Sequence, residues 1–142
     1  MDALAARGTT LKMGDGGDPE VFTPIAKVVN ISGPSLALDT EDATDHDSPG
    51  GWEEVVATIL RTGEVTFTIH YLPASATHGD ATGLVRKMRD RTKTNFQLVF
   101  PDAAPTQWDF AAFVTGFEPQ APHEGKLVAD VTMKPSGQPT LA

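Results

Sequence analysis

The most constraining feature of the sequence is the strict alternation of apolar and polar side chains across residues 64–72 (EVTFTIHYL). A two-residue period places every second side chain on the same face of a β-strand. The apolar side chains of this segment are Val65, Phe67, Ile69 and Tyr71. The alternation therefore predicts a strand with one face buried and with Thr66, Thr68 and His70 on the other face.

Similar short runs, rich in β-branched or aromatic residues, recur along the chain. The expected strands cover residues 21–31, 36–39, 53–61, 64–72, 95–100, 106–117 and 126–134. The 13 glycines and 11 prolines fall mainly between these runs, as an all-β chain requires. The 142 residues suffice for one domain. The pattern predicts a mainly β fold, an antiparallel β-sandwich or barrel of about seven strands.

Two segments depart from the strand pattern. Residues 78–93 (HGDATGLVRKMRDRTK) place Leu84 and Met88 on one apolar helical stripe, with Asp80 as the expected N-cap. Residues 1–20 show no sustained period and end in a glycine-rich stretch. We therefore expect one short α-helix flanking the sheet, and a flexible N-terminal arm.

Residues 39–54 (DTEDATDHDSPGGWEE) carry seven acidic side chains and no lysine or arginine. Mutual repulsion and the Ser-Pro-Gly-Gly run give this segment little reason to order by itself. We expect a long acidic loop that becomes ordered only against a partner, with Trp52 as a buried anchor. The candidate contact residues are Glu41, Asp42, Asp45, His46, Asp47 and Trp52.

The charge of the chain is uneven. It has 19 acidic against 11 basic side chains, a net charge of -8, which argues against a protein that binds nucleic acid through its phosphates. Five of the basic side chains lie within the expected helix: Arg86, Lys87, Arg89, Arg91 and Lys93. Because no aromatic residues interleave them, we expect a solvated or partner-facing stripe rather than a nucleic-acid patch.

The common catalytic and cofactor patterns are missing from the sequence. There is no cysteine, so disulfides, thiolate metal sites and cysteine nucleophiles are excluded. The glycines of residues 14–17 neither follow a strand nor open a helix, and the four histidines form no pair at ligand spacing. No apolar run approaches the roughly 20 residues that span a bilayer. We expect no enzyme activity, no cofactor, no metal and no membrane segment.

The acidic segment leaves an alternative from another class open. Residues 42–47 (DATDHD) loosely resemble an oxygen-rich calcium loop. Counted from Asp45, however, Pro49 stands at the fifth position and Val56 replaces the glutamate at the twelfth. A calcium- or carbohydrate-binding β-sandwich module is the alternative. A hydrolase is disfavoured because no nucleophile and base can be paired.

The order of these elements resembles the tail tube proteins of long-tailed bacteriophages, in particular the lambda-like type. The matching features are the strand at 25–31, the Gly33-Pro34 turn, the polar insertion with TDHDS at 44–48, GEVTF at 63–67, YLP at 71–73, the helix, LVFP at 98–101, VTGF at 114–117 and ADVTMKPSG at 129–137. Together they cover about residues 20–140. Related folds also serve phage-derived secretion devices and gene transfer particles.

The resemblance implies subunits that form stacked hexameric rings around a channel through which DNA passes without specific binding. The acidic loop would then contact a neighbouring ring, and the basic stripe would form an interface. The implied partners are further copies of the chain and the tape-measure, tail-tip and tail-terminator proteins, and assembly would take place in the host bacterial cytoplasm. Strand faces beside the loop predict an acidic channel wall of Asp39, Glu54 and Thr58, with Gln97 and Asp109 as weaker candidates.

Overall fold

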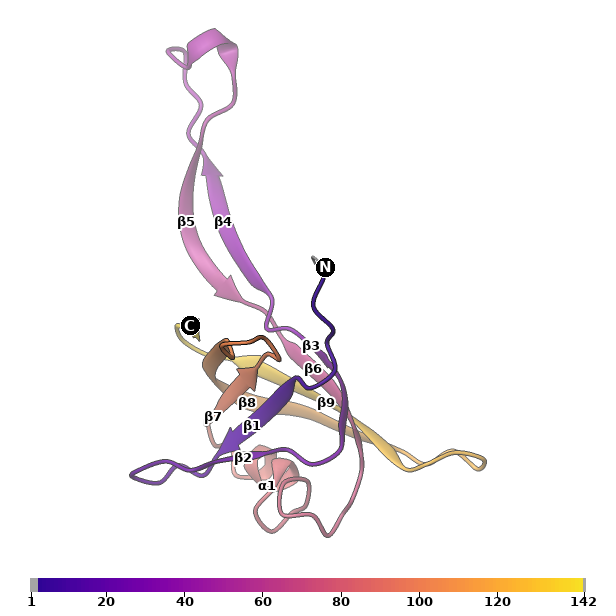
Figure 1. The fold of residues 1–142 in the computed structure, drawn as a ribbon. Helices are drawn as coiled ribbons and strands as arrows, with labels where there is room; N and C mark the ends of the chain where they lie inside the picture. The colour runs from indigo at the N-terminus through magenta and orange to yellow at the C-terminus, as the bar shows by residue number, and fades with distance from the viewer. Residues whose placement is uncertain (1–2, 142) are drawn as a thin grey trace.

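The computed structural model describes residues 3–141, and the chain within this range is mainly β with one short α-helix (Figure 1). The strands are β1 (Thr10–Gly14), β2 (Phe22–Pro24), β3 (Val28–Ser32), β4 (Leu36–Asp42), β5 (Val55–Thr62), β6 (Val65–His70), β7 (Thr94–Val99), β8 (Gln107–Gln120), β9 (Val128–Pro135) and β10 (Thr140–Leu141). The helix α1 spans Leu84–Arg89, and a 3₁₀ turn spans Pro49–Gly51. The predicted fold class is confirmed.

Eight strands form one antiparallel sheet in the order β2-β1-β7-β8-β9-β6-β3, with β10 beside β8. Strand β8 belongs to both halves of this sheet, because residues 107–112 pair with β7 and residues 112–120 pair with β9. The register shifts between Val114 and Gly116, and such a bulge bends a strand and increases its twist. The sheet therefore curves around a common interior (Figure 1).

The interior is filled by the alternating apolar side chains of both halves. On β6, Val65, Phe67 and Ile69 are at most 3% exposed, which confirms the face predicted from the alternation. Phe96 of β7 stacks on Phe110 of β8, with ring centroids 5.8 Å apart. The other fully buried members of this cluster include Leu11, Leu84, Leu98, Ala112, Ala129, Val131 and Met133. Leu84 is the only one from α1, so the helix closes the core from one side.

Strand β1 corrects the expectation that residues 1–20 form a flexible arm. It pairs with β7 on one side and β2 on the other, and its Leu11 and Met13 are 1% and 7% exposed. The run is only five residues long, too short for its alternation to stand out from the glycines that follow. Its burial results from pairing with β7, a segment far away in the sequence.

Three other expected boundaries are also corrected. The strand expected at 21–31 is interrupted between β2 and β3, where Lys27 has a φ of 57°. The expected acidic loop is shorter, because β4 continues to Asp42 and only residues 43–54 connect it to β5. The helix begins after Gly83 rather than at Asp80. Within residues 3–141, no helix is long and apolar enough to cross a membrane.

Candidate assembly interface

Strands β4 and β5 form a separate two-stranded hairpin that projects from one end of the molecule, whereas α1 lies at the opposite end (Figure 1). Seven of the 14 exposed large apolar side chains of residues 3–141 lie on this hairpin and its tip. Leu60 is 81% and Trp52 77% exposed. A two-stranded ribbon is only marginally stable in water by itself, and a contiguous apolar surface marks an interaction site.

The pairing register separates two faces at the base of the hairpin. Leu38 lies opposite Leu60 and Ala37 lies opposite Arg61, so the two leucines share one face while Arg61 belongs to the other. Arg61 forms an ion pair with Asp39, with Nε and Oδ2 2.6 Å apart. The leucine face borders a cavity of about 360 Å³ whose far wall includes Pro139 and Leu141. The apolar face therefore continues from the hairpin onto the C-terminal segment.

The tip of the hairpin, residues 43–54, is organised by hydrogen bonds from its own polar side chains. The amide of Thr44 donates to Oδ1 of Asp42 at 2.9 Å, and the amide of Asp47 donates to Oδ1 of Asp45 at 2.9 Å. Hydrogen bonds from the side chain and backbone of Thr44 lower the pKa of Asp42. The amide of Glu54 donates to Oγ1 of Thr44 at 2.8 Å. The acidic segment thus has internal order that the sequence did not suggest.

The same contacts bear on the calcium alternative. One carboxylate oxygen of Asp45 is occupied by the backbone of Asp47, and Asp42 is occupied in the same way by Thr44. In the part of the chain that the structure describes, no three His, Asp or Glu side chains are close enough to hold a metal ion. All six residues of the predicted contact set, Glu41, His46 and Trp52 among them, are exposed to solvent in the subunit.

Two of the five residues of the basic stripe already have acidic partners. Arg89 forms an ion pair with Asp80, which raises the pKa of Arg89, and Nε of Arg86 lies 3.0 Å from Oδ2 of Asp90. The ion pairs present among residues 3–141 do not involve Lys87, Arg91 or Lys93. Both pairs are half exposed, so each contributes little to stability.

The predicted channel residues fall into two groups. Gln97 and Asp109 lie directly opposite each other on β7 and β8, half-buried on the face away from the core. On the hairpin, Oγ1 of Thr58 donates to the carbonyl of Asp39 at 3.2 Å, and Glu54 lies at the base of the tip. The structure therefore places Gln97 and Asp109 on the main sheet, Asp39 and Thr58 on the hairpin strands, and Glu54 at the hairpin tip.

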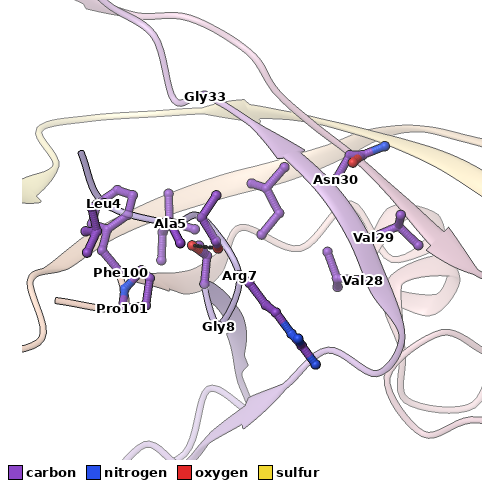
Figure 2. Close-up of a pocket in the computed structure, with 14 residues that line it drawn as sticks. Leu4, Ala5, Arg7, Gly8, Val28, Val29, Asn30, Gly33, Phe100 and Pro101 are labelled. Carbon is purple, nitrogen blue, oxygen red and sulfur yellow. Dashed lines mark hydrogen bonds between the residues drawn. The ribbon is translucent and has the colours of Figure 1, made fainter. Parts of the chain in front are cut away.

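Sequence reasoning did not identify the strands at the two edges of the main sheet, β2 and β3. Strand β3 ends the sheet and pairs with β6 alone among the strands described. A cavity of about 580 Å³ borders it, with β3 on one side and the N-terminal segment, Phe100 and Pro101 on the other (Figure 2). Unpaired strand edges invite pairing with another chain. No sequence signal distinguishes an edge strand from an inner one here, because strand order is set by distant pairing.

Comparison with known proteins identifies the family of this chain. The model of the lambda phage tail tube protein family matches residues 9–142. The chain belongs to the lambda phage tail tube protein family. The match includes β1 and the C-terminal segment as well as the elements expected from sequence, and it makes the chain a structural subunit of a virion tail tube. Among curated proteins, no sequence matches this chain.

Solved structures share the fold of this tail tube protein at low sequence identity. A chain in the tail of an empty gene transfer agent particle, refined with C6 symmetry, has a TM-score of 0.75 and 20% identity, with 99% of both chains covered. A chain of the native gene transfer agent virion has a TM-score of 0.75 and 19% identity, again over 99% of both chains. A chain of an extracellular contractile injection system sheath-tube complex has a TM-score of 0.70 and 14% identity, covering 99% of this chain and 92% of that one.

Proposed function

We propose that this tail tube protein assembles with copies of itself into stacked hexameric rings around a DNA channel, and that the β4–β5 hairpin carries the contact between rings. The observation that carries the proposal is the hairpin itself, because it projects from the sheet and exposes Leu36, Leu38, Leu60 and Trp52 to solvent. Burying such side chains stabilises an assembly by about 25 cal/mol per Å² of apolar surface. The C6 symmetry of the similar gene transfer agent tail supports six subunits in a ring.

Within a ring, the open edge of β3 pairs with a strand of the adjacent subunit. Closing sheets across subunits removes the unpaired edge that an isolated chain must otherwise protect. The cavity between β3 and the N-terminal segment leaves this edge accessible (Figure 2).

The proposed channel wall is predominantly acidic. Its candidates are Asp39, Glu54 and Thr58 on the hairpin and Gln97 and Asp109 on the main sheet. Like charge between wall and phosphate, damped over a Debye length of about 8 Å, keeps DNA from binding persistently without blocking its passage. A tube whose channel is lined mainly by Arg86 and Lys87 would contradict this assignment.

The remaining parts of the proposal concern chemistry and partners. The structural role requires no enzyme activity, cofactor or metal. Besides further copies of the chain, the partners are tape-measure, tail-tip and tail-terminator proteins, by resemblance to the family, and assembly takes place in the host bacterial cytoplasm. No membrane component is needed.

The proposal is tested by negative-stain electron microscopy of concentrated protein, which is expected to show rings and tubes. A second experiment uses a variant in which residues 44–51 are replaced by a short Gly-Ser linker. Its melting temperature should stay close to that of the unmodified chain, while the yield of tubes falls. The matched control replaces residues 121–125, an exposed turn between β8 and β9. Tubes of normal length and yield from the shortened tip would exclude the hairpin as the stacking element.

A further inference from the structure

A cleft of about 410 Å³ lies beside α1, at the end of the molecule opposite the hairpin tip (Figure 1). It is formed by β1, the loop before the helix and the helix itself. Apolar lining is supplied by Met13, Ala76 and Ala81, and Arg86 and Lys87 stand on the helix side. The cleft thus combines an apolar floor with two cationic side chains.

Two segments at opposite ends of the molecule differ in charge. Residues 78–93, around α1, hold five basic and two acidic side chains, whereas residues 39–54 hold seven acidic and no basic ones. Two carboxylates, of Asp15 and Asp90, also border the cleft. Asp90 is paired with Arg86, and Asp15 accepts the amides of Gly17 and Val21 at 2.8 and 3.1 Å. Both carboxylates therefore have partners within the subunit, while Lys87 has no ion-pair partner among residues 3–141.

The hairpin tip carries an exposed tryptophan, a side chain that suits an apolar cleft. Trp52 is 77% exposed and follows Gly50 and Gly51, whose φ values of 64° and 75° form the tight turn before it. An exposed tryptophan on a projecting segment is typical of an anchor that fills a pocket on a partner. The thioether of Met13 on the cleft floor is a favourable neighbour for an indole ring.

We propose that the hairpin tip of one subunit docks into the α1 cleft of a subunit in the next ring. Trp52 enters the cleft, and the carboxylates of Asp45 and Asp47 approach Arg86 and Lys87. This contact rests on the proposed function, because it requires rings that stack in the same direction. A head-to-tail contact between two different patches does not close on itself along the stacking axis, and it therefore generates an open filament.

A disulfide cross-link tests the contact directly, because the chain has no cysteine of its own. Glu53→Cys, which leaves the neighbouring Trp52 in place, combined with Ala81→Cys should give a ladder of linked subunits when assembled tubes are oxidised, since disulfides form only between adjacent Cβ atoms. The matched control combines Glu53→Cys with Ala121→Cys, on the exposed β8–β9 turn. Tubes that give no ladder, or an equal ladder in the control, would overturn the docking site and leave the proposed function standing. Absence of tubes in the unmodified chain would overturn both.

A charge exchange provides a second test that does not depend on cysteine. Asp45→Lys with Asp47→Lys, or Arg86→Glu with Lys87→Glu, should each raise the protein concentration needed for tube formation by about tenfold or more. Combining all four substitutions should restore assembly. The control, Arg91→Glu with Lys93→Glu, changes the net charge equally outside the cleft and should have a much smaller effect. Failure of the fourfold variant to recover, while its melting temperature is normal, would contradict the contact.

Discussion

At the scale of single residues, His78 shows how a buried polar side chain joins two parts of the fold. It is 0% exposed, its Nδ1 accepts the amide of Leu72 at 3.1 Å, and its Nε2 lies 2.6 Å from the carbonyl of Ala26. Because an amide can only donate and a carbonyl only accept, the ring is neutral with its proton on Nε2. His78 therefore holds the loop before α1 to the turn between β2 and β3.

Replacing His78 by alanine is expected to lower the free energy of unfolding by about 3 kcal/mol, because it leaves a cavity and deprives two part-buried backbone groups of their partner. Denaturant unfolding measures the change. The control is His70→Ala on the polar face of β6, where a loss below about 0.5 kcal/mol is expected. Equal losses for the two variants would show that the hydrogen bonds of His78 have no special role.

At the scale of elements, the β4–β5 hairpin differs from the core strands because the paired Leu38 and Leu60 are 53% and 81% exposed. The double variant Leu38→Ser and Leu60→Ser should therefore change the free energy of unfolding by less than about 0.5 kcal/mol and yet reduce tube formation strongly. Light scattering and electron microscopy measure the assembly. Leu72→Ser, another exposed leucine outside the hairpin, is the control that should leave assembly unchanged. Normal tubes from the double variant would contradict the role of this face.

The loop between β7 and β8 is expected to make the free energy of unfolding depend on pH. Hydrogen bonds from the hydroxyl and amide of Thr106, at 2.6 and 2.7 Å, lower the pKa of Asp102 below its usual 3.8. A carboxyl whose pKa is lower in the folded state contributes stability above its unfolded pKa, and this is lost as the pH falls through the folded value. Thr106→Val should therefore flatten the fall in unfolding free energy below about pH 4. An unchanged pH profile in urea titrations would exclude this contribution.

At the scale of the whole molecule, the structure consists of an eight-stranded sheet and a hairpin that projects from it (Figure 1). Neither part depends on a metal in the proposed role. Chelation with EDTA should therefore leave both the melting temperature and the yield of tubes unchanged. Loss of tubes in EDTA, restored by Ca²⁺, would favour a carboxylate site completed between subunits and would revive the calcium-binding alternative.

Much of the fold followed from local pattern in the sequence. The period-two alternation of residues 64–72 alone determined which face of β6 is buried, since successive side chains of a strand must point to opposite sides. Likewise, the spacing of Leu84 and Met88 indicated the helix, and the uneven charge separated an acidic from a basic segment. The order of these motifs was sufficient to suggest the tail tube family.

Only the tertiary structure decided the features that depend on pairing between distant segments. Leu11 is buried because β1 lies beside β7. Strand β8 belongs to both halves of the sheet because β7 pairs with one part of it and β9 with the other. Strand β3 is an edge because, among the strands described, it pairs with β6 alone. The predicted channel residues were divided between the main sheet and the hairpin for the same reason. Hydrophobic periodicity indicates which side chains of a strand are buried. Strand order depends on which distant segments pair, and a local pattern in the sequence does not contain that information.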